Sequence, residues 1–218
     1  AMTGGGDPSQ VSATTSIGLS GSCFPGHYCP PGSEYPTKAP LGSSASDAGM
    51  MASTLCFTGT WAPLRGTRTC RDCPAGHSCT SFGTYVPQMC PAGTYRSRAD
   101  STTCRPCPAG TWSPYAGLLD RSQCEPCPPG RVCPSQRMTS MEKSVPCMSG
   151  FACGEATDSR TQFKIQCPAG YHCGSATPAS EMYKNTCPAG HYCIRGTKTE
   201  SAYQSKCRIG QFCPPGTT

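Results

Sequence analysis

The sequence predicts a linear array of small disulfide-rich repeats, built from short β-hairpins and turns with little helix. Its 218 residues include 20 cysteines, 25 glycines and 23 prolines, a composition typical of disulfide scaffolds. A short pattern of cysteine and glycine recurs from residue 23 onward. The remaining apolar residues are scattered singly, so no continuous interior of the kind found in a large globular domain is expected.

Ten repeat units recur along the chain, and each begins with a cysteine and has a glycine three residues later. The first cysteines are Cys23, Cys56, Cys73, Cys90, Cys107, Cys127, Cys147, Cys167, Cys187 and Cys207, and the glycines are Gly26, Gly59, Gly76, Gly93, Gly110, Gly130, Gly150, Gly170, Gly190 and Gly210. The units are 33 residues apart once, 17 apart three times and 20 apart five times, and a short fixed period is typical of repeat arrays. The sequence between cysteine and glycine predicts a β-turn with proline at its second position and glycine where the backbone takes positive φ.

Two stretches lack cysteine. Residues 1–22 are rich in Gly, Ser and Thr, which indicates a flexible leader or linker, or a segment that lies along the array or a neighbouring subunit. Residues 23–218 form the cysteine-rich array, and within its first unit residues 30–55 form an insertion about as long as one repeat. We expect part of this insertion, Ser46–Leu55, to form a short turn of helix.

An aromatic ring follows most of the repeat glycines. The eight rings are Tyr28, Trp61, Tyr95, Trp112, Phe151, Tyr171, Tyr192 and Phe212. We interpret each ring as packing on a disulfide or on the turn of the adjacent repeat, because so small a unit has little else to bury. The alternative interpretation is an aromatic ladder that binds a ligand such as carbohydrate.

Each unit contains two cysteines, and two disulfide frames are open. Pairing within units uses all twenty and gives Cys23–Cys29, Cys56–Cys70, Cys73–Cys79, Cys90–Cys104, Cys107–Cys124, Cys127–Cys133, Cys147–Cys153, Cys167–Cys173, Cys187–Cys193 and Cys207–Cys213. The shifted frame joins the second cysteine of each unit to the first of the next. It leaves Cys23 and Cys213 unpaired and needs three C-x-x-C disulfides, a spacing more typical of redox or metal sites. The within-unit frame is favoured. The shifted frame stays open, because its pairs in the later repeats have the same spacing as Cys56–Cys70 and Cys90–Cys104 of the within-unit frame.

Zinc is the strongest alternative role for the cysteines. Cys104-x2-Cys107 followed by Cys124-x2-Cys127 matches the spacing of a four-cysteine ribbon, but the same residues belong to two successive repeats. The histidines lie beside cysteines in the units, where we interpret them as substitutes for Thr or Tyr at turn positions; they are His27, His77, His172 and His191. We therefore expect no metal and no cofactor.

No catalytic constellation is visible in the sequence. The 12 acidic residues are dispersed, no histidine stands outside a repeat unit, and no Gly-rich phosphate loop precedes a predicted helix. We expect that the protein is not an enzyme.

The net charge of +6 comes from 18 Lys and Arg residues spread along the chain. Nucleic-acid binding proteins usually show a denser basic stripe, and no run reaches the roughly 20 apolar residues that span a bilayer. An even, high number of cysteines predicts an oxidising compartment, hence an extracellular or cell-surface protein. The chain opens without a signal peptide, which indicates a mature chain or an excerpt of a longer one.

The segment from Cys90 to Cys107, with C-P-A-G-T-Y followed by a Ser/Thr-rich stretch and C-x-x-C, resembles the ephrin-receptor-like cysteine-rich repeat. It is also similar to the first half of a TNF-receptor cysteine-rich module. The form C-P-A-G-H-Y-C at Cys187–Cys193 resembles repeats of large protist and algal surface proteins, including mastigoneme-type flagellar-hair filaments. These resemblances imply a stiff extracellular stalk of disulfide-linked β units, in which Cys90 pairs with Cys104.

Two functions fit such an array. One is a structural subunit of an extracellular filament, stalk or surface coat that self-associates, and the other is a ligand-binding, receptor-like or adhesive ectodomain. Five consecutive twenty-residue intervals favour the structural role, because a receptor usually concentrates variation in one or two repeats. Ser/Thr-rich stretches at Ser12–Ser22 and Ser43–Ser53 are expected to carry O-linked glycans, whereas Asn185-Thr186-Cys187 is a marginal N-linked acceptor.

Overall fold

The computed structural model describes residues 21–98 and 102–218. The chain divides into two compact units, one comprising Ala1–Asp72 and Cys79–Pro87 and the other Cys73–Ser78 and Gln88–Thr218. The leader predicted for residues 1–22 lies outside the described residues except for its last two. Within the described ranges, no helix is long and apolar enough to cross a membrane.

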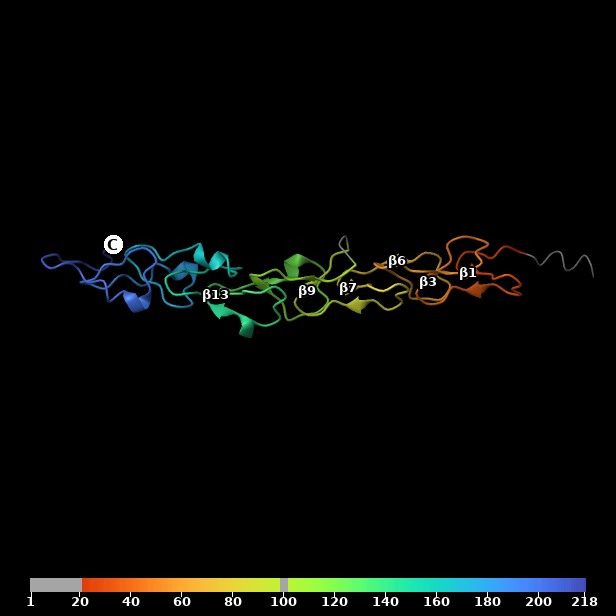
Figure 1. Cartoon of the computed structure of the whole chain (residues 1–218), viewed down its shortest axis with the longest axis horizontal. Coiled ribbons are helices and arrows are strands. Elements are labelled where there is room, and N and C mark those ends of the chain that lie inside the picture. Colours follow the sequence, from red (N-terminus) through yellow and green to blue (C-terminus); the bar gives the residue numbers. More distant parts are fainter. Residues whose placement is uncertain (1–20, 99–101) are drawn as a thin grey trace, which may run out of the picture. The chain divides into compact units, whose positions relative to one another are not determined.

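The regular structure of the described residues consists of two-stranded antiparallel hairpins and 3-10 turns (Figure 1). The first unit contains β1 (His27–Tyr28) paired with β2 (Thr37–Lys38), β3 (Ser43–Ser44) with β4 (Thr54–Leu55), and β5 (Thr60–Trp61) with β6 (Arg71–Asp72). The second unit contains β7 (His77–Ser78) paired with β8 (Gln88–Met89), β9 (Thr94–Tyr95) with β10 (Arg105–Pro106), β11 (Thr111–Trp112) with β12 (Glu125–Pro126), and β13 (Arg131–Val132) with β14 (Val145–Pro146). Its 3-10 turns are η2 (Arg121–Gln123), η3 (Met141–Lys143), η4 (Thr161–Phe163), η5 (Ala179–Glu181) and η6 (Thr199–Ser201). The predicted fold class is confirmed.

Each hairpin follows from the repeat sequence. In the repeat that begins at Cys90, the N–H of Thr94 donates to the carbonyl of Pro91 over 3.1 Å, and Gly93 has φ +72°. The turn therefore starts at proline, which takes its first position and not the second position that we predicted; glycine takes the third position of a type II turn. The strand leaving this turn pairs with the two residues before the next repeat, so Thr94 lies opposite Pro106. Proline is tolerated there because each strand has only one partner.

The insertion at 30–55 is itself a repeat. Ala39-Pro40-Leu41-Gly42 takes the place of the cysteine-led turn, and the N–H of Ala39 donates to the carbonyl of Gly26 at 2.9 Å, as that of Cys56 does to Gly42 at 2.8 Å. The helical turn predicted for Ser46–Leu55 is wrong. Its last two residues form β4, and Gly49 has φ +77°, a left-handed conformation that interrupts a right-handed helix.

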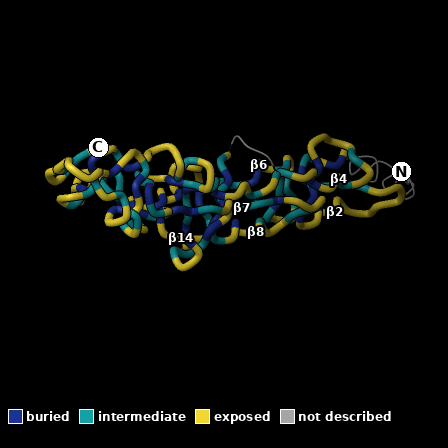
Figure 2. The backbone as a smooth tube through the Cα atoms, turned by 60° about the vertical axis from the view of Figure 1, so that its left-hand side comes forward, coloured by how far each residue is buried: buried dark blue, intermediate teal, exposed yellow. Residues whose placement is uncertain are grey.

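The interior consists mainly of cystines and small side chains. Val132 and Met138 are the largest fully buried residues described, and most of the others with no exposed surface are half-cystines. In one typical cluster Cys127, Cys133 and Met138 are buried together, with Trp112 packed against them. Figure 2 shows buried residues in short stretches that alternate with exposed ones along the chain. Each repeat thus contributes a few buried atoms and depends on its neighbours.

Candidate functional site

The most regular feature of the second unit is a ladder of backbone hydrogen bonds between successive repeats. The N–H of each turn glycine donates to the carbonyl of the second cysteine of the next repeat, in the pairs Gly110–Cys133, Gly130–Cys153, Gly150–Cys173, Gly170–Cys193 and Gly190–Cys213, over 2.8–3.0 Å. The N–H of each first cysteine donates back to the glycine of the preceding repeat, as from Cys167 to Gly150 at 2.9 Å. Because the residue offsets are constant from the repeat at Cys107 onward, the interfaces between these repeats are built in the same way.

The contacts also reach two repeats ahead. Gly150 has φ +87°, and a Cβ built on it would lie 2.5 Å from the carbonyl oxygen of Gly196; for Gly170 the corresponding distance to Gly216 is 2.6 Å. Glycine is required at this position both by the positive φ and by the close approach of another backbone. The predicted role of the repeat glycines thus extends beyond their own turn, to the packing of a later repeat.

The repeat interface also contains threonines that the sequence analysis missed. Thr157, Thr177 and Thr197 are buried, and each hydroxyl donates to the carbonyl three residues earlier. Their own carbonyls accept the N–H groups of Cys133, Cys153 and Cys173, respectively, over 2.9–3.1 Å. Their twenty-residue spacing in the sequence was the signal that could have identified them.

The cysteines form disulfides, and none is free. The structure joins Cys23–Cys29, Cys56–Cys70, Cys90–Cys104, Cys107–Cys124, Cys127–Cys133, Cys147–Cys153, Cys167–Cys173, Cys187–Cys193 and Cys207–Cys213, and Cys73 and Cys79 are disulfide-bonded as well. These joined pairs belong to the within-unit frame. The four cysteines that match a zinc ribbon are therefore divided among three disulfides, and disulfide sulfurs are not the thiolate ligands that zinc needs.

The first cysteine of a repeat has its partner at one of two places in the sequence, and the place differs between repeats. In the knuckle repeats its partner is six residues on, whereas Cys56, Cys90 and Cys107 pair with a residue 14 or 17 positions later. Where the sixth position is not cysteine it is still buried, and it holds Ala45, Ala62, Arg96 or Ser113. This position therefore belongs to the core in every such repeat, whichever partner forms the disulfide.

The predicted aromatic positions divide into packed and exposed ones. Tyr95, Trp112 and Phe151 pack on clusters that contain cystine, while Tyr28, Trp61 and Tyr171 are half-buried. Tyr192 is 39% exposed and Phe212 is 89% exposed, so the packing role predicted for Phe212 is wrong. In the repeats that begin at Cys147, Cys167 and Cys187, the residue directly after glycine makes a ring contact instead, and it is Phe151, Tyr171 or His191.

A second set of rings completes the packing of the last repeats. Phe151 contacts Phe163, Tyr171 contacts Tyr183, and His191 contacts Tyr203, with ring centroids 5.2, 5.3 and 5.9 Å apart and nearly perpendicular planes. The edge-to-face geometry is one that aromatic pairs prefer. We call Phe163, Tyr183 and Tyr203 the outer rings. The sequence analysis missed them because each lies twelve residues after the ring that follows the repeat glycine, although they too recur every twenty residues.

The histidines have separate environments. His191 occupies a ring position, as predicted for a substitute of Tyr, and its Nδ1 lies 3.1 Å from the carbonyl of Ala189. His172 lies between repeats, with Nδ1 3.2 Å from the hydroxyl of Thr199, and burial lowers its pKa. Within the described residues, no cluster of His, Cys, Asp and Glu has the geometry of a metal site.

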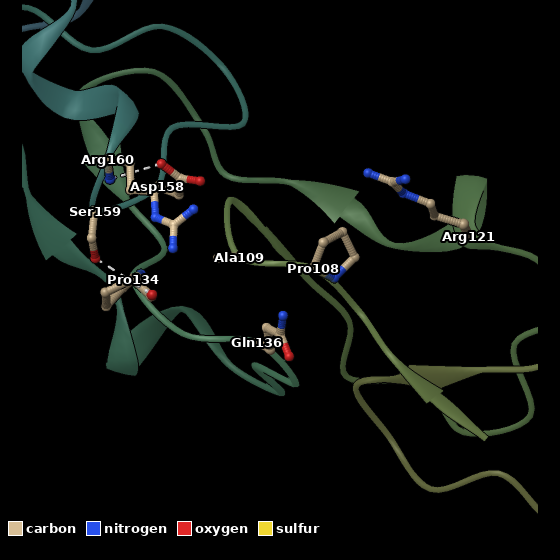
Figure 3. Close-up of a pocket in the computed structure, with 8 residues that line it drawn as sticks. All are labelled: Pro108, Ala109, Arg121, Pro134, Gln136, Asp158, Ser159 and Arg160. Carbon is tan, nitrogen blue, oxygen red and sulfur yellow. Dashed lines mark hydrogen bonds between the residues drawn. The ribbon is translucent and has the colours of Figure 1, made fainter. Parts of the chain in front are cut away.

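A hollow of about 490 Å³ opens on the surface of the second unit, between three successive repeats (Figure 3). It is lined by Pro108, Ala109, Arg121, Pro134, Gln136, Asp158, Ser159 and Arg160. The carboxylate of Asp158 accepts hydrogen bonds from the N–H and hydroxyl of Thr161 and from the N–H of Arg160, which together lower its pKa. This carboxylate holds a turn, and none of the eight lining residues supplies the histidine or thiol of an acyl-transfer site.

Comparison with known families finds a match for one part of the chain. A family model described as tyrosine-protein kinase ephrin type A/B receptor-like matches residues 83–124. This segment contains β8 to η2 and the disulfides Cys90–Cys104 and Cys107–Cys124. No curated protein matches the sequence. The chain is thus similar to ephrin-receptor-like cysteine-rich repeats over this segment, and together with the disulfides the match indicates an extracellular or secreted protein.

Proposed function

We propose that this chain is a structural segment of an extracellular filament, stalk or cell-surface coat, and that it catalyses no reaction. The observation that carries the proposal is the ladder of identical backbone hydrogen bonds between successive repeats of the second unit. When every interface has the same hydrogen bonds, an additional repeat lengthens the array without forming a distinct binding site. A structural spacer requires this property.

The disulfides suit an exposed appendage. Each repeat that begins with a cysteine is closed by a cystine, either as a knuckle of six-residue separation, as in Cys147–Cys153, or as a longer loop, as in Cys107–Cys124. A disulfide in each repeat restricts the chain even when that repeat unfolds locally. Local unfolding therefore exposes little extended backbone for a protease to cleave. The resemblance of the C-P-A-G-H-Y-C units to those of protist and algal filament proteins motivates the same assignment.

Self-association is part of the proposal. Residues 1–22 are the segment that we assign to contact with another subunit, and the Ser/Thr-rich stretches at 12–22 and 43–53 are assigned to O-linked glycans. The insertion at 30–55, which without a fold of its own would also be free to reach another subunit, is not assigned to this contact, because residues 39–55 form a repeat with its own hairpin. No nucleic acid, cofactor or membrane insertion is part of this function.

Electron microscopy and light scattering of the purified, oxidised protein test the proposal. We expect filaments or higher-order assemblies of the whole chain, and monomers after deletion of residues 1–22. Intact-mass measurement of native material tests the glycans, whose presence adds mass in steps of a sugar residue. Monomers with and without the leader would contradict self-association.

A receptor-like or adhesive ectodomain is the second candidate, and the observation that favours it is the ephrin-receptor-like match over residues 83–124. In that case the protein stays monomeric at all concentrations and binds one defined partner with saturation. Light scattering in the presence and absence of candidate extracellular proteins distinguishes the two functions.

A further inference from the structure

A groove lined by three consecutive repeats of the second unit, those that begin at Cys147, Cys167 and Cys187, has the composition of a carbohydrate-binding site. Its lining includes the outer rings Phe163 and Tyr183 together with Ile165 and Pro168. Phe163 and Tyr183 are 46% and 57% exposed, so each ring keeps about half of its surface available. Exposed rings side by side in a concave surface are typical of ligand sites and not of a solvated face.

The rings are held in position before any ligand arrives. Phe163 ends η4 and contacts the ring of Phe151 edge to face, and Tyr183 follows η5 and contacts Tyr171 in the same way. The chain between them is fixed by the N–H of Ala152, which donates to the carbonyl of Ile165 at 2.9 Å. Such preorganisation reduces the entropy that binding costs.

The charge of the groove is positive. Lys164 and Arg195 line it together with the amide of Gln166, and none of its lining residues is acidic. In the part of the chain that the structure describes, the ion pair nearest in sequence joins Lys184 to Glu181 at 3.6 Å, and neither groove cation takes part in an ion pair. Arginine and lysine therefore remain available to a carboxylate or sulfate group.

Part of this combination recurs in the next repeat. Tyr183-Lys184 and Pro188 stand twenty residues after Phe163-Lys164 and Pro168, and Tyr203 follows Tyr183 at the same interval, but Pro215 stands in the place of Arg195. A row of rings with one period matches a ligand that is itself periodic. An extended peptide fits less well, since strand addition needs an open strand edge, whereas here the repeats meet through single bridges such as Cys173–Lys198.

We propose that the groove lined by Phe163, Lys164, Tyr183 and Arg195 binds an acidic polysaccharide. The sugar rings would lie against the aromatic side chains, and their carboxylate or sulfate groups would contact the two cations. This inference is independent of assembly, because a single chain supplies every residue that lines the groove.

Binding of defined glycans to the oxidised full-length chain tests the proposal. Calorimetric titrations at about 0.15 M salt compare a carboxylated oligogalacturonate, a sulfated dextran and a neutral dextran of equal length. We expect binding to an acidic glycan and none to the neutral one, and the two acidic arms determine whether carboxylate or sulfate is preferred. Absence of binding to both acidic glycans at millimolar concentration overturns the proposal.

Variants separate this groove from a general attraction to a basic protein. Tyr183→Ala should weaken binding about tenfold, and Tyr183→Phe should retain it, because the ring and not the hydroxyl is the contact. Replacing both Lys164 and Arg195 with alanine should weaken binding to a similar degree and reduce its salt dependence. Tyr115→Ala and Arg208→Ala are matched controls at exposed positions outside the groove, and they should bind as the native chain does.

Two further outcomes decide against the proposal. If Tyr183→Ala binds as tightly as the native chain while its melting temperature is unchanged, the attraction is due to the net charge alone. If a polyglutamate peptide of equal charge competes as well as the acidic glycan, the groove recognises charge and not sugar rings.

Discussion

At the scale of the residue, the array depends on glycines at which a Cβ atom would overlap the backbone of another repeat. Gly150 and Gly170 meet the carbonyls of Gly196 and Gly216, two repeats further along. The carbonyls that approach these glycines belong to a second turn with positive φ, and the residue there is glycine at 196 and 216 but alanine at 156 and 176, which face Gly110 and Gly130. The first position thus tolerates only glycine for reasons of space, whereas the second is constrained by φ alone.

Gly150→Ala should lower the free energy of unfolding by about 2–4 kcal/mol, since it combines left-handed strain with overlap against fixed backbone. Gly154→Ala is the matched control four residues away, because a Cβ there meets nothing within 4 Å and its φ is not positive. Thermal unfolding of the oxidised variants measures both. Equal melting temperatures for the two would show that the backbone approach is not a constraint.

His172 makes stability depend on pH. Its folded-state pKa lies below the ordinary value of 6.5 because burial disfavours the charged form. As pH falls below about 6.5, the unfolded chain takes up the proton first, so this contribution to stability is complete above that pH and is lost as pH falls through the folded pKa. The effect should be small, because the ring is only partly buried.

Melting temperatures of native protein and His172→Gln at pH 7.5 and 5.5 test this. The native chain should lose more stability on acidification than the variant, which keeps a polar group beside Thr199. An identical decrease in both proteins would assign the pH dependence to other groups.

At the scale of the element, the repeats that could be predicted were those that retained their cysteines. Cys-x-x-Gly predicted the turns, whereas the pairing of the strand after each turn with the two residues before the next repeat is seen only in the structure. The repeat at 39–55 escaped detection because Ala39 stands where cysteine does elsewhere, and its buried position with 0% exposure is visible only in the structure. The outer rings Phe163 and Tyr183 escaped because only the rings beside glycine were considered, although the groove depends on them.

Restoring the missing cystine tests the equivalence of this repeat. Ala39 and Ser53 lie seventeen residues before Cys56 and Cys70, which form a disulfide with Cα atoms 5.7 Å apart. The double variant Ala39→Cys/Ser53→Cys should therefore form an additional disulfide and raise stability by about 3 kcal/mol. Peptide mapping without reduction should recover the new link, and Ala39→Cys/Ser53→Ala is the control without it. A pair of free thiols in the folded double variant would contradict the alignment of this repeat.

The disulfide frame is also testable element by element. Proteolysis without reduction should yield Cys167 linked to Cys173 and Cys187 linked to Cys193, because a six-residue knuckle brings their Cα atoms to 5.8 Å. A dominant link from Cys173 to Cys187 would establish the shifted frame instead.

At the scale of the whole molecule, stability is distributed among the repeats and their interfaces, since each buried cluster of the described residues is small. The four buried clusters of the second unit hold three residues each, apart from their half-buried neighbours. In such arrays stability is approximately a sum of repeat and nearest-neighbour terms. The loss of one repeat should therefore destabilise only the repeats that it contacts.

Removal of residues 207–218 tests this reach. It deletes the carbonyl of Cys213 that accepts from Gly190 at 2.9 Å, that of Thr217 that accepts from Cys193 at 3.0 Å, and the Gly216 turn that packs on Gly170. Hydrogen exchange followed by mass spectrometry should show faster exchange over residues 167–206 and unchanged exchange over residues 102–146, because the lost contacts reach back two repeats and no further. Faster exchange throughout 102–206 would mean that the unit unfolds as one cooperative body, and unchanged exchange at 187–206 would mean that the ladder contributes nothing to its stability.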